Sequence, residues 1–208
     1  PTRSAGPREV LRAAHERDVL FAAYFGVILV MLLYNLFLFA SVGDRSYLEY
    51  SIYILMVGGT QLVLNVYGPF FGVDEYPWLN IRLIQFFGVF SGLTTIVFAQ
   101  NFLRLSRFVP WLHKLLNFYF ALYLVAFVLA IFGQLVWSYN VINFCALAIF
   151  FFIPGAIITM RQGYAPAKYF LLAFSVFIAA VMVFVLKDTG LIPYNAWTFF
   201  ALPLGSAF

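Results

Sequence analysis

Long apolar segments separated by short polar ones set the pattern of this chain. The clearest segment runs from Leu83 to Leu103, contains no charged residue and is bounded by Arg82 and Arg104. As an α-helix rising about 1.5 Å per residue it is about 30 Å long, the thickness of the hydrocarbon core of a bilayer. Backbone polar groups must be satisfied inside a bilayer, and barrel-type alternation is absent, so each segment is predicted to be a helix.

The pattern predicts an all-α, polytopic membrane protein: a bundle of seven transmembrane helices with the seventh truncated. No residue between Lys114 and Arg161 is charged, which suits two spans that turn at Trp137-Ser138. The predicted spans are residues 19–40, 50–70, 83–103, 115–136, 139–160, 169–186 and 192–208. Residues 1–18 are predicted to form a polar extracytoplasmic juxtamembrane segment with a short helix after Pro7, leading into the bundle at 19–208. The chain starts at a proline and stops in an apolar run, so both ends are expected to continue.

Composition supports membrane insertion. The 208 residues are 64% hydrophobic and only 10% charged, whereas about a quarter of a soluble domain is charged. Lipid must therefore cover most of the outer surface, and the bilayer is the first expected partner. The net charge of +4 could suggest nucleic acid. The cations lie in short loops at span ends, however, where membrane topology accounts for them, so no nucleic-acid partner is expected.

The basic loops predict the orientation, because loops rich in Lys and Arg stay in the cytoplasm. Six cations fall in the odd-numbered loops: Arg45, Arg104, Arg107, Lys114, Arg161 and Lys168. The other side has only Arg82 and Lys187. This places the N-terminus outside and the C-terminus in the cytoplasm. The N-terminal segment disagrees, since it holds four arginines, but an upstream domain could translocate regardless of them.

Prolines and glycines predict local helix geometry. Pro154 should bend the fifth helix at Phe150, and Pro203 should bend the seventh at Phe199, because proline removes a backbone donor. Gly88 and Gly92, four residues apart in the third span, would allow a neighbouring helix to approach closely. Ordinary bundle packing and homodimerisation both remain open as readings of this spacing.

The chemistry of enzymes and pumps is absent from the predicted spans. None has a charged residue or a histidine in its apolar core, which argues against a proton-coupled transporter, an ion pump and a retinal protein. His15 and His113 both lie outside the spans and cannot build a metal site alone. We expect no catalytic residue, metal or cofactor in this segment, which is not predicted to be an enzyme.

The remaining polar groups in the spans are amides, which the alternating span directions sort by depth. The outer half holds Gln61, Asn65, Gln85, Gln134 and Asn143. The inner half holds Asn35, Gln100, Asn101 and Asn117. One reading is ordinary interhelical hydrogen bonding, worth about 0.6 kcal/mol per bond. The other is that the outer set lines a ligand pocket and the inner set forms a packing switch near the cytoplasm.

Several stretches resemble the bacterial seven-transmembrane receptors with diverse intracellular signalling modules. They are YNLFLFASVGDRSYLEYSIYIL (34–55), WLNIRLIQ (78–85), NFLRLSRFVPWLHKLL (101–116), RQGYAPAKYFLLAF (161–174) and DTGLIP (188–193). The resemblance implies location in the bacterial inner membrane, with an extracytoplasmic sensor domain before the bundle. It also implies a cytoplasmic output module after it, commonly a histidine kinase, a diguanylate cyclase or a phosphatase. Catalysis belongs to that module.

Three functions follow as hypotheses. The favoured one is a transmembrane sensor and relay, in which an outside stimulus shifts the equilibrium between two packings of the bundle. The second is a carrier for a small solute, which lacks support from a visible inverted repeat or a coupling charge. The third is a passive anchor or dimerisation platform.

Overall fold

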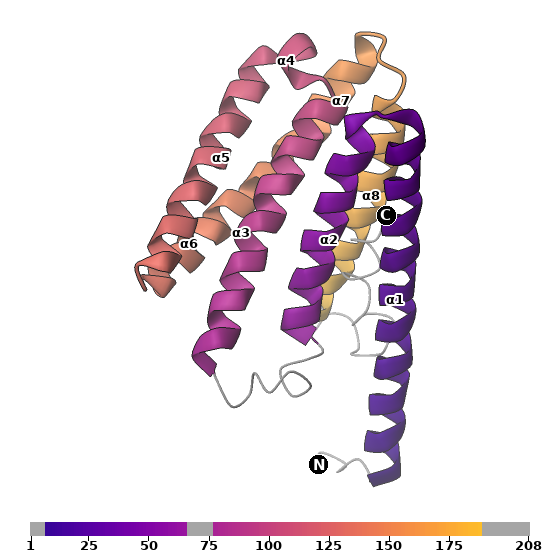
Figure 1. Cartoon of the computed structure of the whole chain (residues 1–208), viewed down its shortest axis with the longest axis vertical. Helices are drawn as coiled ribbons and strands as arrows, with labels where there is room; N and C mark the ends of the chain where they lie inside the picture. The colour runs from indigo at the N-terminus through magenta and orange to yellow at the C-terminus, as the bar shows by residue number, and fades with distance from the viewer. Residues whose placement is uncertain (1–6, 66–76, 189–208) are drawn as a thin grey trace. The chain divides into compact units, whose positions relative to one another are not determined.

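Helices account for the secondary structure of the described chain. The computed structural model describes residues 7–65 and 77–188, and these contain no β-strand, which confirms the all-α class. The first helices are α1 (Pro7–Val42), α2 (Arg45–Asn65), α3 (Pro77–Phe102) and α4 (Leu105–Phe108). They are followed by α5 (Pro110–Ile131), α6 (Leu135–Ala146), the 3-10 helix η2 (Leu147–Phe151), α7 (Phe152–Arg161) and α8 (Ala167–Asp188) (Figure 1).

The chain divides into two compact units. One combines residues 1–30 with 173–208, and the other is Met31–Leu172. In the first unit, α1 buries Phe21, Tyr24 and Ile28, whose spacing places them on one helix face. The ring of Tyr24 meets that of Phe25 edge-on at 5.2 Å. Helix α1 continues through Asp18 without a break, so the predicted juxtamembrane helix and first span form one helix.

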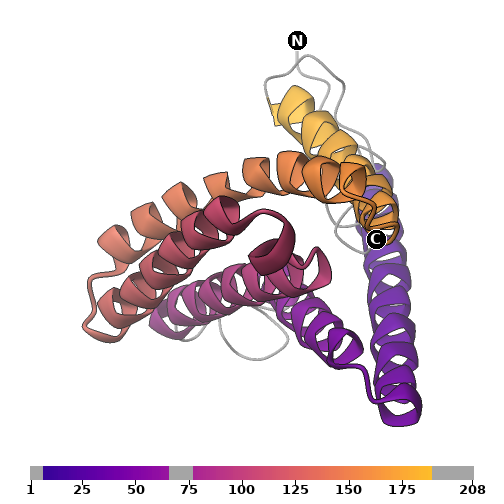
Figure 2. The same cartoon turned by 90° about the horizontal axis from the view of Figure 1, so that it is seen from above.

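In the Met31–Leu172 unit, α3 is the central helix. It contacts α2 as well as α5 and α6, and α5 and α6 contact each other as a hairpin (Figure 2). Helix α3 buries the apolar side chains of Val89, Leu93, Ile96 and Ala99. Helix α5 buries Leu112, Leu116, Tyr119, Tyr123 and Ala126. Both sets recur every three or four residues, the spacing that gives a helix one buried face.

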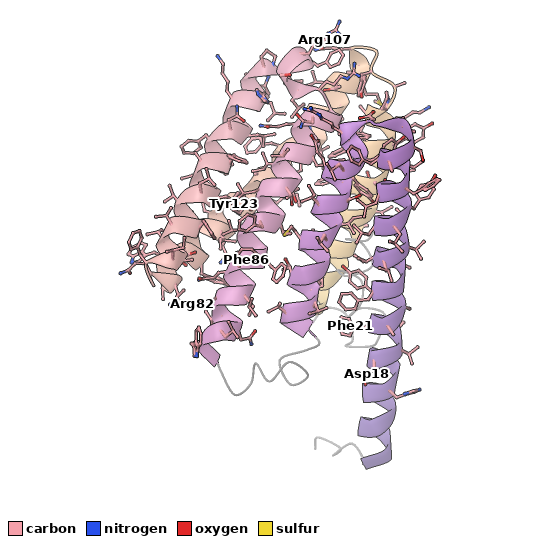
Figure 3. The ribbon with its side chains drawn as sticks, viewed as in Figure 1. Asp18, Phe21, Arg82, Phe86, Arg107 and Tyr123 are labelled. Atoms are coloured by element: carbon pink, nitrogen blue, oxygen red, sulfur yellow. The ribbon has the colours of Figure 1, made fainter. Side chains whose placement is uncertain are left out.

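Two glycines let neighbouring helices approach closely. A Cβ at Gly92 of α3 would overlap the ring of Tyr123 of α5 (Figure 3). A Cβ at Gly59 of α2 would overlap the ring of Phe87 of α3. By contrast, a Cβ at Gly88 would meet nothing within 4 Å. Of the predicted pair, Gly92 therefore provides the close approach, whereas the space beside Gly88, one helical turn earlier, is open.

Four stretches of the described chain are long and apolar enough to cross a membrane. They are Asp18–Val42, Trp78–Phe102, Pro110–Ile131 and Leu135–Arg161, with a shorter apolar stretch at Ala167–Val176. Helix α2, which carries Glu49 and Gln61, is not among them. Of the predicted second span, residues 66–70 lie outside the described residues, as does the whole of the predicted seventh span.

The structure moves several predicted boundaries. The hairpin between the fourth and fifth spans turns at residues 132–134, not at Trp137-Ser138, which lies inside α6. Gly133 supplies the turn with φ of 77°, which glycine adopts without strain. Helix α5 starts at Pro110, ahead of the predicted Leu115, because proline fits the first helical position. Neither the turn at Gly133 nor the helix start at Pro110 can be located from the spacing of charged residues alone.

The fifth predicted span is not one regular helix. The 3-10 helix η2 (Leu147–Phe151) lies between α6 and α7. Pro154 follows it in the first turn of α7 and has no N–H to donate to the carbonyl of Phe150. Pro203 and its predicted bend at Phe199 lie outside the described residues.

Candidate functional site

A set of polar contacts between helices lies at one end of the Met31–Leu172 unit, called here the Arg104 end. The turn between α1 and α2, the short helix α4 and the turn between α7 and α8 meet there (Figure 1). Five side chains, from the N-terminal parts of α2 and α5 and the last turn of α3, form what we call the polar cluster: Glu49, Gln100, Asn101, His113 and Asn117.

Gln100 joins α3 to α5. Its Nε2 donates to the Oδ1 of Asn117 at 3.0 Å and to the backbone carbonyl of His113 at 3.2 Å. The Nδ2 of Asn117 lies 3.4 Å from the Nε2 of His113. Because an amide nitrogen can only donate, this contact is a hydrogen bond when Nε2 of the ring accepts and Nδ1 carries the proton. Nδ1 is buried with no partner among the described residues.

Asn101, the next residue of α3, joins this helix to α2. Its Nδ2 donates to Oε1 of Glu49 at 2.8 Å. The second oxygen of Glu49, Oε2, is buried and has no partner in the described part of the chain. Consecutive residues of α3 thus tie it to two different neighbours, so a shift of α3 at this end changes both contacts together.

Arg104 connects the turns of the same end. It has φ of 50° and ψ of 43°, a left-handed conformation that residues other than glycine rarely adopt. Its guanidinium lies over the ring of Tyr164 in the turn between α7 and α8, with Cζ 5.2 Å from the ring centroid.

Asp44 lies in the turn between α1 and α2. Its Oδ1 accepts a hydrogen bond from the N–H of Ser46 at 2.9 Å, which lowers the pKa of Asp44, and the positive charge of Arg104 lowers it further. Asp44 directly precedes α2, so it occupies the position where a carboxylate stabilises the start of a helix.

The arrangement is suited to changes in packing. Its contacts join side chains of three helices, and most of its members are reachable by solvent. No group of three His, Cys, Asp or Glu side chains among the described residues could hold a metal ion. Each interhelical hydrogen bond of this kind is worth roughly 0.6 kcal/mol.

The predicted inner amides are only partly brought together. Gln100 and Asn117 are bonded to each other, and Asn101 adjoins them. Asn35 is buried, but its Nδ2 donates to the carbonyl of Met31 in its own helix at 2.8 Å. It forms no hydrogen bond with the polar cluster.

The predicted outer amides differ in their surroundings. Gln85 is buried, and its Nε2 donates to the carbonyl of Leu135 in α6 at 2.7 Å. Gln61 is buried in α2. Gln134 and Asn143 are exposed, and neither side chain forms a hydrogen bond with the described residues. The side chain of Asn65 lies outside the described part of the chain.

The six cations used to predict orientation are all exposed. They are Arg45, Arg104, Arg107, Lys114, Arg161 and Lys168, and they belong to the elements that meet at the Arg104 end. Arg82 lies at the other end of α3, where its guanidinium is 5.7 Å from the ring of Trp78 (Figure 3). We call this opposite end, with the turn at 132–134, the Arg82 end.

Sequence reasoning missed Glu49 and His113 as members of the cluster. Glu49 precedes the predicted second span and His113 lies in a predicted loop, so the pattern of spans selects neither residue. One signal was available for His113: it lies four residues before Asn117, the spacing that places two side chains on one helix face. The left-handed conformation of Arg104 has no sequence signal, since arginine is not the residue that this conformation favours.

Comparison with known proteins gives one match. The family model described as 7TM diverse intracellular signalling matches residues 17–208. No curated protein and no solved structure matches the chain. The match covers nearly all of the chain and agrees with its apolar helices. The chain therefore belongs to the family of 7TM diverse intracellular signalling proteins, and it is a multi-pass transmembrane signalling domain.

Proposed function

We propose that this domain relays an extracytoplasmic stimulus to a cytoplasmic output module by a change of packing at the Arg104 end. The observation that carries the proposal is the polar cluster, in which Gln100 ties α3 to α5 and Asn101 ties α3 to α2. The domain itself is assigned no catalysis. A sensor domain before the bundle and an output module after it complete the proposed receptor.

The energies are of the right size for such a switch. Interhelical hydrogen bonds of the cluster are worth about 0.6 kcal/mol each, and a tenfold shift between two packings needs about 1.4 kcal/mol. Exchange of two or three contacts therefore supplies a tenfold bias. A stimulus acts on this equilibrium only through its different affinity for the two packings.

The switch is tested by distance measurements on the full chain in lipid nanodiscs. Spin labels are placed at Ser41→Cys in α1 and Ser106→Cys in α4, both exposed, while the buried Cys145 is left unlabelled. We expect two distance populations. Gln100→Leu should change their ratio by about threefold for each hydrogen bond lost.

Asn143→Leu is the matched control, because this amide is exposed and forms no hydrogen bond with the described residues. It should leave the ratio unchanged. A single distance population that neither substitution alters would contradict the packing switch.

We also propose that the protein lies in the bacterial inner membrane with the Arg104 end in the cytoplasm. The support is the collection of six exposed cations at that end. A membrane-impermeant maleimide should label Ser106→Cys in inside-out vesicles and Gln134→Cys in spheroplasts. The reverse labelling pattern would invert the orientation and detach the polar cluster from a cytoplasmic output module.

A further inference from the structure

Four cations lie at the helix ends and turns of the Arg104 end, and two of them, Arg104 and Arg107, each lie over one ring of an aromatic pair. We call them the basic cluster: Arg104, Arg107, Arg161 and Lys168. Arg104 and Arg107 come from the start and the body of α4, Arg161 ends α7, and Lys168 lies at the start of α8. All four are exposed. The rings of Phe108 and Tyr164, whose centroids are 5.6 Å apart, connect α4 to the turn between α7 and α8.

The charge of this cluster has little compensation within the chain. No Asp or Glu occurs between Glu75 and Asp188, so α3 to α7 contain only cationic charges. Asp44 is the acid that influences Arg104, and it is already engaged by the N–H of Ser46. Glu49 is a second acid at this end, so the four cations outnumber two carboxylates and create a field that attracts a further anion.

Aromatic rings restrict three of the cations. The guanidinium of Arg104 lies 5.2 Å from the ring of Tyr164, and that of Arg107 lies 5.7 Å from the ring of Phe108. The Nζ of Lys168 lies 4.9 Å from the ring of Tyr169. Stacking on a ring limits side-chain motion but leaves the N–H groups along the edge of a guanidinium free to donate.

The position of the cluster indicates which anion it meets. Trp111, near the start of α5, and Tyr169, near the start of α8, are both exposed, as expected for rings at the headgroup level of a bilayer. The long apolar stretch ending at Arg161 reaches the same level. The anion that is abundant at this depth is the phosphate of a phospholipid.

We propose that the basic cluster binds the phosphate of an anionic phospholipid such as phosphatidylglycerol, with Arg104 and Arg107 as the principal donors. Two guanidinium groups on neighbouring rings can each direct paired N–H groups at one phosphate. The negative headgroup then bridges α4 and the turn between α7 and α8. This site does not depend on the signalling relay proposed above, because any function that keeps the bundle in an anionic membrane can use it.

The test measures lipid retention by native mass spectrometry. The full chain is released from micelles that contain equal amounts of phosphatidylglycerol and phosphatidylcholine. Wild-type protein should retain phosphatidylglycerol selectively. Arg104→Gln with Arg107→Gln should lower its retention roughly fivefold for each charge removed, the ratio that corresponds to about 1 kcal/mol.

Arg82→Gln is the matched control. Arg82 is also exposed and also lies over an aromatic ring at 5.7 Å, but at the other end of α3. It should leave retention unchanged. An equal loss with Arg82→Gln, or no loss with the double substitution, would overturn the site because the binding would then follow total charge alone.

Further substitutions and a competition with inorganic phosphate test the proposal in other ways. Arg161→Gln and Lys168→Gln alter exposed residues of other elements, so they test the same cluster should the substitutions in α4 prevent folding. Each should lower retention by a similar factor, and normal retention in both would count against the cluster. Displacement of the lipid by millimolar inorganic phosphate would show a site for free phosphate and overturn the lipid assignment.

Discussion

The two ends of the Met31–Leu172 unit join their helices with different kinds of hydrogen bond. At the Arg82 end, Gln85 donates to the carbonyl of Leu135, and Ser138 donates to the carbonyl of Ala126 at 2.8 Å. Both acceptors belong to the backbone. At the Arg104 end, Gln100 also donates to a backbone carbonyl, that of His113, but its bond to Asn117 and the bond of Asn101 to Glu49 join side chain to side chain.

Because of this difference, we expect the contacts of the Arg82 end to stay fixed and those of the Arg104 end to rearrange. A backbone carbonyl moves only when its helix moves, so the bonds of the Arg82 end hold α5 and α6 in one register. Side-chain acceptors can turn away and take new partners without moving the helix. Among the described residues, Oε2 of Glu49 and Nδ1 of His113 have no partner, so the proposed exchange could use them. In the proposed switch, the side-chain bonds of the Arg104 end are therefore the contacts that rearrange.

The largest expected effect comes from forcing α3 and α5 apart between the two ends. Gly92→Leu inserts a side chain where the ring of Tyr123 already lies. Overpacking of this kind costs about 1–3 kcal/mol. Unfolding in SDS, followed by circular dichroism, should show this loss, and the polar contacts at both ends should weaken together.

Gly88→Ala is its control, one helical turn earlier on α3, where a Cβ meets nothing within 4 Å. It should be neutral or stabilise the helix, because alanine favours helix over glycine by up to about 1 kcal/mol. If both substitutions destabilised the protein equally, close packing of Gly92 on Tyr123 would not be the cause.

The second effect concerns the fixed end. Ser138 is fully buried, and Ser138→Ala removes its bond to the carbonyl of Ala126. We expect a loss of about 1 kcal/mol in the free energy of unfolding, measured by the same SDS titration. Ser106→Ala, at an exposed position of α4, should change it very little. A larger loss at Ser106 would contradict the role assigned to Ser138.

A third prediction measures the adjustable end. A double-mutant cycle of Gln100→Leu and Asn117→Leu should give a coupling energy of about 0.6 kcal/mol, because one side-chain hydrogen bond joins the pair. Pairing Gln100→Leu with Asn143→Leu should give none, since Asn143 is exposed on α6. Equal coupling in both cycles would remove the distinction between the two ends.

The smallest expected effect depends on pH. The pKa of Asp44 lies below its ordinary value of 3.8, chiefly because the ionised carboxylate accepts the N–H of Ser46. Its stabilising contribution is therefore complete above that ordinary value and is lost as the pH falls through the lowered pKa. Asp44→Asn should flatten the acid limb of the thermal stability profile, and an unchanged limb would contradict this assignment.

The fold was largely readable from the sequence, because uninterrupted apolar segments such as Leu83 to Leu103 leave helices as the only satisfied backbone in a bilayer. The family was readable from local stretches, and the match over residues 17–208 confirms it. The positions of the turns were harder to predict from the sequence. The midpoint of an uncharged run pointed to Trp137-Ser138, whereas the left-handed Gly133 sets the turn.

The site was less predictable than the fold, because depth along a helix does not give the direction of a side chain. Gln100 and Gln134 read alike as amides at span ends, yet one is buried between helices and the other is exposed. Which neighbours a residue such as Glu49 meets depends on how α2 is rotated against α3. That rotation follows from contacts far apart in the sequence, such as Gly59 against Phe87.

The 3-10 helix η2 has a mechanical consequence. Its five residues rise about 2.0 Å each, compared with about 1.5 Å in an α-helix. Rewinding Leu147–Phe151 into α-helical form would shorten the rod from Leu135 to Arg161 by about 2.5 Å. Phe152, buried directly after the segment, would be drawn along with it. Such rewinding would therefore move Arg161 relative to Leu135 along the helix axis, and neither α6 nor α7 would need to bend.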